Sequence, residues 1–450
     1  MKLIDIIEVF IAGDWGEETY SKETPCAVTC VRGADIIPIS EYDFSAIPVR
    51  YINQQAYARK CLQVGDIIIE KSGGSPTQST GRVSLVSQEL LDHAGAVICS
   101  NFCTAFRVKK GWIPLYVYYY LQFIYNLGAF FNFEGKTSGI KNLQLDAAFA
   151  AIPIEDISES IQNNIVAILQ GLERKIAINR QINQNLEAMA KQLYDYWFVQ
   201  FDFPNEEGKP YKSSGGEMVW NEKLKRKIPN EWDNCKLKDF INLFDSKRIP
   251  LSSKDREERK GNYPYYGATG IMDYVNEYIF DGDYILLAED GSTSDSKGFP
   301  IVQYIWGKNW VNNHAHIILP KNEQYLMFTY QMLRSIPAKQ IETGSIQKKI
   351  SQENLCEYNM VLPNSILIEK YESIISPLWE KRKLCIEEIN ALIKQRDELL
   401  PLLMNGQASV NSDLLACILS YILISVYRNL GIISFAGNLP INTKTTISRL

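Results

Sequence analysis

The stretch that decides the fold is GDIII at residues 65–69, because the chain repeats it as GDYIL at residues 282–286. Two further pairs keep the same order: KLID at 2–5 with KLKD at 236–239, and TSGIK at 137–141 with TGSIQ at 343–347. Each half then ends in a long, periodic, highly charged segment. The sequence therefore predicts an α+β protein in which one globular domain occurs twice and a long helix follows each copy.

The composition agrees with packed domains. A chain of 450 residues exceeds what one hydrophobic core usually serves. The hydrophobic fraction of 46% argues against disorder. Nine scattered cysteines suggest reduced thiols in a cytoplasmic protein, and we expect neither a secretory signal nor a metal site. Proteins that bind nucleic acid by charge are usually basic, whereas this chain has a net charge of −5. If the chain binds DNA, its basic surface must be local, or the affinity must be shared with a partner subunit.

Composition shifts and capping signals divide the chain. Asp156-Ile157-Ser158-Glu159 resembles a capping box and opens the first long helix. The aromatic stretch Leu115–Ile124 predicts a helix packed into the first domain, with a counterpart over Tyr325–Leu333. The predicted segments are a first domain over 1–155, a long helix over 156–204, a second domain over 215–363, a second long helix over 364–406 and an atypical hydrophobic tail over 407–450.

Both long segments carry apolar residues at spacings of three and four, which is typical of a coiled coil. The predicted seam has a register break near Ile176 and includes Ile161, Ile165, Leu172, Leu186, Met189, Leu193, Trp197, Leu378, Ile389, Leu392 and Leu399. We expect the two helices to form an antiparallel pair rather than to cover each its own domain. A helix of roughly 40 residues spans about 60 Å, enough to separate two DNA contacts by one to two helical turns.

Several motifs of the second half resemble one known family. They are IPNEW at 228–232, KRIP at 247–250, GNYPYYGATG at 261–270, LLAEDG at 286–291, VNNHAH at 311–316 and LPLLMNGQ at 400–407. This pattern resembles the DNA-specificity subunit of type I restriction–modification enzymes, over residues 1 to about 410.

The resemblance implies two target recognition domains, each reading half of a bipartite, asymmetric DNA sequence. It implies that the long helices, the central and C-terminal conserved regions of that family, act as spacer and as docking surface for two methyltransferase (modification) subunits, which restriction/translocase subunits then join. The chain itself would not be an enzyme. S-adenosylmethionine, Mg²⁺ and ATP would be bound by the partner subunits.

Residue types that read bases or phosphates gather in the two TSGIK-like loops. The candidate DNA contacts are Lys136, Thr137, Ser138, Lys141, Asn142, Lys247, Arg248, Thr343, Ser345, Gln347, Lys348 and Lys349. Around 247–260, acidic residues alternate with basic ones, so part of that stretch is expected to be a solvated helix face.

Other functions stay open on the sequence alone. Glu134-x-Lys136 and Asp295-x-Lys297 match the end of a metal-nuclease pattern. A free-standing adenine methyltransferase would need an Asn/Asp-Pro-Pro-Tyr/Phe loop, which the chain does not contain. A motor protein would need a phosphate-binding loop, and in the best match Phe130 occupies the first glycine position. A repeat-built scaffold without DNA is a further alternative. His314 and His316 are expected on the same side of a strand, either as a hydrogen-bonded pair that closes a strand edge or with one of them reaching DNA or holding a recognition loop.

The tail departs from the family pattern. Its apolar run Leu414–Tyr427 has 14 residues, short of the ~20 that cross a bilayer. Our hypothesis is an adventitious extension from a frame-altered or recombined gene end, and a membrane anchor is the alternative. Truncation after Gln407 should therefore leave DNA binding unchanged and raise the soluble yield. Loss of DNA binding in the truncated chain would contradict the hypothesis.

Overall fold

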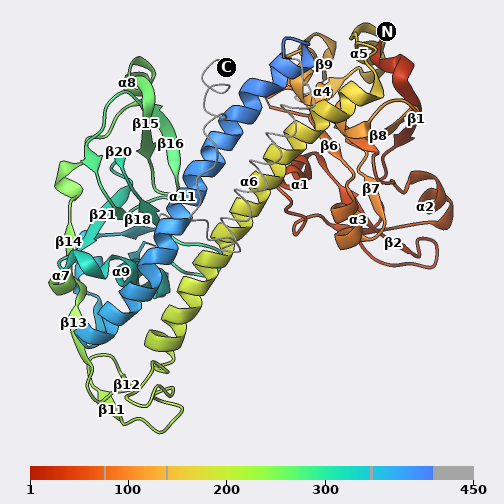
Figure 1. The fold of residues 1–450 in the computed structure, drawn as a ribbon. Helices are drawn as coiled ribbons and strands as arrows, with labels where there is room; N and C mark the ends of the chain where they lie inside the picture. Colours follow the sequence, from red (N-terminus) through yellow and green to blue (C-terminus); the bar gives the residue numbers. More distant parts are fainter. Residues whose placement is uncertain (76–77, 138–139, 345–347, 409–450) are drawn as a thin grey trace, which may run out of the picture. The chain divides into compact units, whose positions relative to one another are not determined.

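The computed structural model describes residues 1–75, 78–137, 140–344 and 348–408 (Figure 1). The predicted tail therefore lies outside the described residues from residue 409 onward. The chain forms two compact units. Among the described residues, the first unit contains Met1–Gln181 and the residues from Ile386 to Ala408, and the second contains Ile182–Cys385.

A four-stranded antiparallel sheet lies at the centre of the first unit, in the order β1 (Ile7–Ala12), β8 (Cys103–Val108), β4 (Ile67–Glu70) and β6 (Val83–Leu85). A second sheet contains β3 (Val49–Ile52), β2 (Cys26–Val31) and β7 (Val97–Cys99). The short helices are α1 (Ile36–Ser40), α2 (Gln54–Lys60), α3 (Gln88–Ala94) and α5 (Leu145–Ala151). The apolar residues of GDIII, Ile67–Ile69, thus belong to β4, the third strand of the central sheet.

The second unit repeats this central sheet. Its order is β14 (Ile241–Leu243), β21 (Ala315–Pro320), β18 (Tyr284–Ala288) and β19 (Val302–Ile305), again antiparallel throughout. A neighbouring sheet contains β16 (Ile271–Val275), β15 (Lys260–Tyr266), β20 (Lys308–Val311) and β17 (Phe280–Asp281). The remaining elements are β11 (Met218–Asn221), β12 (Arg226–Pro229), β13 (Asp233–Lys236), β24 (Asn359–Leu362), α7 (Leu237–Phe240), α8 (Ser253–Glu258) and α10 (Gln352–Glu357). GDYIL occupies the place in this sheet that GDIII has in the first, which confirms the predicted duplication.

An aromatic helix fills the core of each unit, as the sequence predicts. In the first unit α4 (Pro114–Asn126) begins with a proline, which suits the first helical turn. Its buried residues are Tyr116, Val117, Tyr118, Tyr119, Tyr120, Leu121, Phe123 and Ile124. In the second unit α9 (Leu326–Ser335) buries Phe328, Tyr330 and Leu333. Burial of so many large side chains fixes each sheet against its helix.

The long helices are α6 (Glu159–Tyr194) and α11 (Ser365–Met404), with 36 and 40 residues. The first was predicted over 156–204. The α-helix ends at Tyr194 and continues as a π-helical turn over Asp195–Val199. Among the described residues, no helix is both long and apolar enough to cross a membrane.

Each unit contains one section of the α6–α11 pair. In the first unit, Leu172 and Ile176 of α6 form a buried cluster with Ile389 and Leu392 of α11, and Leu399 packs beside it. Ile165 belongs to the first unit's main core, together with Leu400, Leu403 and Met404 of α11. An early part of one helix therefore contacts a late part of the other, which is an antiparallel arrangement.

In the second unit, Trp197 and Tyr371 pack ring to ring with centroids 6.1 Å apart, and the Tyr371 hydroxyl donates to the Ala190 carbonyl oxygen at 3.1 Å. Leu186 is buried, and Leu193 and Leu378 pack against this unit's core. The seam prediction was wrong for Ile161 and Met189, whose side chains are exposed.

A polar layer occupies the predicted register break. Lys175 and Asn179 of α6 are buried. Lys175 pairs with Glu388 of α11, and the Asn179 side-chain amide donates to the same carboxylate at 2.7 Å. Such a layer allows one alignment of the helices, because a shift along the seam would bury these groups without partners.

Candidate nucleic-acid interface

The two TSGIK-like segments form equivalent hairpins. Hairpin 1 consists of β9 (Glu134–Thr137) and β10 (Ile140–Leu143), and β10 also pairs with β5 (Ser72–Gly73). Hairpin 2 consists of β22 (Glu342–Thr343) and β23 (Lys349–Ile350). Ten of the twelve predicted DNA contacts belong to these two segments, and those that the structure describes are Lys136, Thr137, Lys141, Asn142, Thr343, Lys348 and Lys349. Residues 138–139 and 345–347, which include the predicted contacts Ser138, Ser345 and Gln347, lie outside the described residues.

The strand register shows that the hairpins match residue for residue at their bases. Glu134 lies opposite Leu143, and Glu342 lies opposite Ile350. The amides of Leu143 and Ile350 each donate, at 2.8 Å, to the carbonyl of the first residue after the central strand β4 or β18. Each hairpin is therefore attached at the same place on its own sheet.

The base of hairpin 1 is held by the Glu134 carboxylate. Its Oε1 accepts from the Thr80 backbone amide at 2.7 Å and from the Thr80 hydroxyl at 3.1 Å. Its Oε2 lies 3.3 Å from Lys141 Nζ, which also donates to the Gln78 carbonyl at 3.0 Å. The side chains of Glu134 and Lys141 are 3% and 13% exposed. Thr80 lies in the loop between β5 and β6, so the carboxylate connects the hairpin to that loop.

The base of hairpin 2 has the same arrangement. Glu342 Oε1 accepts from the Thr293 hydroxyl at 2.6 Å, and Oε2 lies 3.1 Å from Lys348 Nζ. Lys348 also donates to the Ser294 hydroxyl at 3.3 Å. The Glu342 side chain is 8% exposed. Thr293 and Ser294 lie between β18 and β19, the loop equivalent to the one that carries Thr80.

Both glutamates are held as carboxylates. Burial alone would raise the pKa of Glu134, but the Thr80 amide and hydroxyl and Lys141 lower it below its ordinary value. Burial likewise would raise the pKa of Glu342, and Thr293, Ser294 and Lys348 lower it. Hydrogen bonds and a cation therefore outweigh desolvation at both positions.

Other predicted contacts in the hairpins also have partners for their side chains, on strand β5, within hairpin 2 or just after β18. The Ser72 hydroxyl donates to the Asn142 side-chain oxygen. The Thr343 hydroxyl donates to the Lys349 carbonyl at 3.3 Å, and Lys349 Nζ lies 3.2 Å from Glu289. For Lys136 and Thr137 the structure describes the backbone in β9.

Lys247 and Arg248 differ from each other although they are adjacent. Lys247 is exposed, with its ammonium 5.1 Å from the Phe244 ring centroid. Arg248 is 12% exposed and lies 2.7 Å from Glu289 and 3.5 Å from Asp245, and it donates to the Ala315 carbonyl at 2.9 Å. This geometry gives Arg248 a structural role inside the domain, and its contact with DNA stays a prediction.

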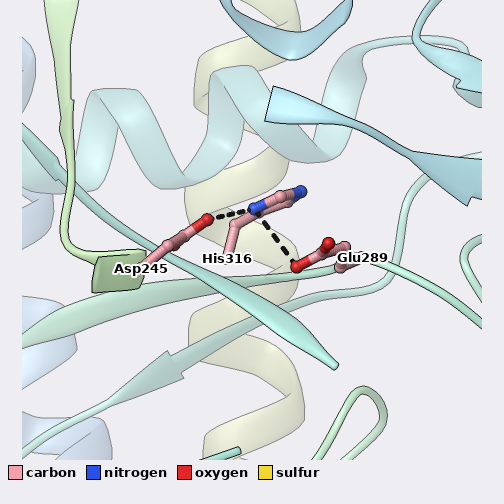
Figure 2. Close-up of side chains that lie close together, drawn as sticks. All are labelled: Asp245, Glu289 and His316. Carbon is pink, nitrogen blue, oxygen red and sulfur yellow. Dashed lines mark hydrogen bonds and ion pairs between the residues drawn. The ribbon is translucent and has the colours of Figure 1, made fainter. Parts of the chain in front are cut away.

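Arg248 is part of a buried network around His316, which Figure 2 shows between Asp245 and Glu289. His316 Nδ1 lies 2.6 Å from Asp245, and Nε2 lies 2.8 Å from the Ile350 carbonyl of hairpin 2. A carbonyl oxygen only accepts, so Nε2 donates to it. The network therefore links the core of the sheet to the base of hairpin 2.

Asp245 is the residue that joins this network together. Besides His316 it accepts from the Ile317 amide at 2.9 Å and from the Gln352 side chain at 2.6 Å. Burial would raise the pKa of Asp245, and these donors together hold it below its ordinary value. The sequence analysis singled out His316 but missed Asp245 and Gln352. Asp245 is 71 residues from His316 in the sequence, and Gln352 is 107 residues from Asp245.

Asp245, Glu289 and His316 are also the one group among the described residues whose ligand atoms lie close enough together for a metal ion, within 4.8 Å. Their surroundings do not fit a cation. Both nitrogens of His316 face oxygen atoms, and Arg248 and Lys349 already neutralise Glu289. We therefore assign these three residues to the domain's scaffold.

The pair of histidines is not arranged as predicted. β21 begins at Ala315, so His314 lies in the preceding turn, and its side chain is 47% exposed beside Asp290. His316 is completely buried. The expectation that both lie on the same side of a strand was wrong, because the alternation of a strand does not extend to His314.

The nuclease patterns are accounted for by local structure. Glu134 belongs to the base of hairpin 1, as described above. The Asp295 side chain accepts from the backbone amides of Lys297 and Phe299, both at 2.9 Å, in a surface turn. Neither residue belongs to the metal-compatible group found among the described residues.

Comparison with known proteins gives the family. A model described as the type I restriction modification DNA specificity domain matches residues 41–188 and 229–387, more than half of the chain. A protein of Haemophilus influenzae named as a type I restriction enzyme specificity subunit is 34% identical over 142 residues, which is 32% of this chain and 35% of that protein. The type I restriction enzyme MjaIX specificity subunit of Methanocaldococcus jannaschii is 24% identical over 331 residues, 67% of this chain and 71% of that subunit.

The fold is also that of a solved relative. The crystal structure of the type I restriction–modification S subunit from M. genitalium matches with a TM-score of 0.54 at 16% identity, covering 90% of this chain and 95% of that one. The duplicated sheet and the duplicated hairpin agree with the two separate matches to the domain model. The chain therefore belongs to the DNA-specificity subunit family of type I restriction–modification systems and carries two copies of that family's domain.

Proposed function

We propose that the chain is the sequence-specific DNA-recognition subunit of a type I restriction–modification complex, without catalytic activity of its own. Each unit reads one half of a bipartite target through its hairpin. The observation that carries this proposal is the repetition of a hairpin on the same site of the same sheet. Since the two hairpins differ in sequence, the target is asymmetric.

The hairpin tips and the residues beside them are the proposed DNA contacts. Lys136, Thr137 and Ser138 would reach DNA from hairpin 1, and Thr343, Ser345 and Gln347 from hairpin 2. Hydroxyl and amide groups suit base edges, and lysine suits phosphate. Lys141 and Lys348 are paired with glutamates, so they add little net positive charge. A chain with a net charge of −5 therefore depends on partner subunits for much of its DNA affinity.

We also propose that α6 and α11 bind two methyltransferase subunits, to which restriction/translocase subunits attach. Exposed apolar side chains on these helices support docking. Ile366, Leu384 and Met189 are 74%, 65% and 51% exposed, and a docked subunit would remove such apolar side chains from water. The methyl donor, Mg²⁺ and ATP are bound by these partners, and the complex acts in the cytoplasm.

The test is a genome-wide map of methylated adenines in the source cell, with and without the gene for this chain. We expect methylation at one two-part, asymmetric motif with a fixed gap to disappear without the gene. An identical map in both strains would contradict the proposal. Methyltransferase or nuclease activity of the purified chain alone, with methyl donor or Mg²⁺, would instead favour a free-standing enzyme.

A further inference from the structure

We infer that Glu134 and Glu342 are positioning residues, each of which sets the presentation of its own hairpin and thereby the specificity of one half of the DNA target. The inference rests on the proposed function. Neither residue is expected to touch DNA. Each acts through the threonine and lysine that it holds, here called the Thr–Glu–Lys clamp: Thr80, Glu134 and Lys141 in clamp 1, and Thr293, Glu342 and Lys348 in clamp 2.

The two clamps agree down to individual atoms. In both, Oε1 of the glutamate accepts from a threonine hydroxyl and Oε2 lies 3.1–3.3 Å from the lysine ammonium. In both, the threonine lies in the segment between the third and fourth strands of the central sheet. The threonine partners lie 54 and 49 residues from their glutamates, so local sequence does not force the contact.

The burial of the glutamates separates the clamps from ordinary surface ion pairs. An exposed pair contributes little, because water and salt screen it. Glu134 and Glu342 are only 3% and 8% exposed, and loss of their partners would leave a carboxylate without hydrogen bonds in a poorly solvated place. A rigid hairpin base is what base reading requires, since bidentate contacts tolerate only small displacements.

Around this common clamp the two copies differ. Beside clamp 1, Asn142 accepts from Ser72, a neutral pair. Beside clamp 2, Lys349 pairs with Glu289, which also binds Arg248. The copies therefore share the clamp and differ around it, both in these side chains and in the pairing of hairpin 1 with β5. This division is expected if presentation is common to both halves and base preference is particular to each.

The test replaces one clamp at a time in the complete complex and reads the methylated motif. Glu342→Gln removes the charge that Lys348 neutralises and keeps the side chain's size. We expect base preference to fall from about 10–100-fold toward none at positions of one half of the motif, while the other half is read normally. Glu134→Gln should relax the other half.

The control variants come from exposed glutamates, each of which pairs with an arginine of its own unit. Glu277, 66% exposed beside Arg259, controls for Glu342, and Glu18, 80% exposed beside Arg50, controls for Glu134. Glu277→Gln and Glu18→Gln should leave both halves of the motif unchanged. If Glu342→Gln does not fold, Thr293→Val is read by the same criterion, because it removes one hydrogen bond and preserves shape.

The outcomes are distinct. Relaxation confined to one half for each variant, with an unchanged melting temperature of the other unit, supports the inference. Equal relaxation or loss of both halves, or an unaltered motif in both variants, overturns it. Absence of any methylation that depends on the unsubstituted chain overturns the proposed function itself, and the inference with it.

Discussion

Replacing Asp245 with asparagine is expected to lower the free energy of unfolding of the second unit by about 3–5 kcal/mol. The amide can still accept from the Ile317 backbone. The substitution, however, removes the negative charge at Oδ2, which lies 2.6 Å from both His316 Nδ1 and the Gln352 side-chain nitrogen. The substitution therefore breaks a buried ionic network by removing one partner, which costs more than the network itself contributes. Denaturant unfolding of the full chain, followed through the second unit, measures the loss.

The chain contains a matched control for this experiment. Asp290 and His314 form the same type of pair, also at 2.6 Å, with side chains 30% and 47% exposed. Asp290→Asn should cost less than about 1 kcal/mol, because solvent replaces the lost contact. Equal losses for Asp245→Asn and Asp290→Asn would show that burial does not strengthen the His316 network, and would remove its role as the support of hairpin 2.

The sequence was sufficient for the duplication, the aromatic helices and the antiparallel long helices, because each leaves a repeated or periodic pattern along the chain. It was also sufficient for the family. It was not sufficient for the roles of single charged residues. Glu134 resembled half of a nuclease pattern, yet its decisive neighbour, Thr80, is brought to it by the sheet. For Arg248 the sequence did not reveal the contact with Glu289, because that residue is 41 positions away, and its DNA contact stays a prediction.

The same limit explains the errors in the coiled-coil seam. Ile161 and Met189 fit the heptad spacing but are exposed, since a spacing of three or four fixes a helix face only locally. Near the predicted break, the buried polar groups Lys175 and Asn179 occupy the seam instead of apolar residues. Apolar periodicity cannot reveal such a layer, because its partner Glu388 lies on the other helix.

A second large change in stability is expected from a substitution at Glu372 of α11. The Glu372 carboxyl group accepts hydrogen bonds from the Phe328 backbone amide at 2.7 Å and from the Ser376 hydroxyl at 3.0 Å. The equivalent residue of the first unit is neutral. Gln162 of α6 accepts from the Ile113 amide at 2.8 Å, at the start of α4. Each long helix thus caps the aromatic helix of its own unit, once with an amide and once with a carboxyl group. Glu372→Gln gives the second unit the same side chain, a glutamine, that the first unit has at Gln162.

Burial decides how Glu372 titrates. Desolvation raises the pKa of Glu372 from 4.5 to about 7, against the lowering effect of the hydrogen bonds from Phe328, Ser376 and Met327. Below pH 4.5 the group is protonated in the folded and the unfolded chain. Between pH 4.5 and about 7 the unfolded chain ionises first, so stability falls as pH rises, by about 3 kcal/mol in total. Above pH 7 the loss is complete.

Glu372→Gln is therefore expected to make the second unit more stable than the native chain at pH 8, by up to about 3 kcal/mol, and nearly equal to it at pH 4.5. Its amide oxygen can accept from Phe328 and its NH₂ group can donate to Ser376, so neither contact is lost. Unfolding free energies measured from pH 4.5 to 8 test this directly. Glu369→Gln, an exposed position on the same helix, should leave the pH dependence of the native chain unaltered. If the profiles of Glu372→Gln and the native chain run parallel, the carboxyl group at Glu372 does not titrate in this range and burial does not govern it.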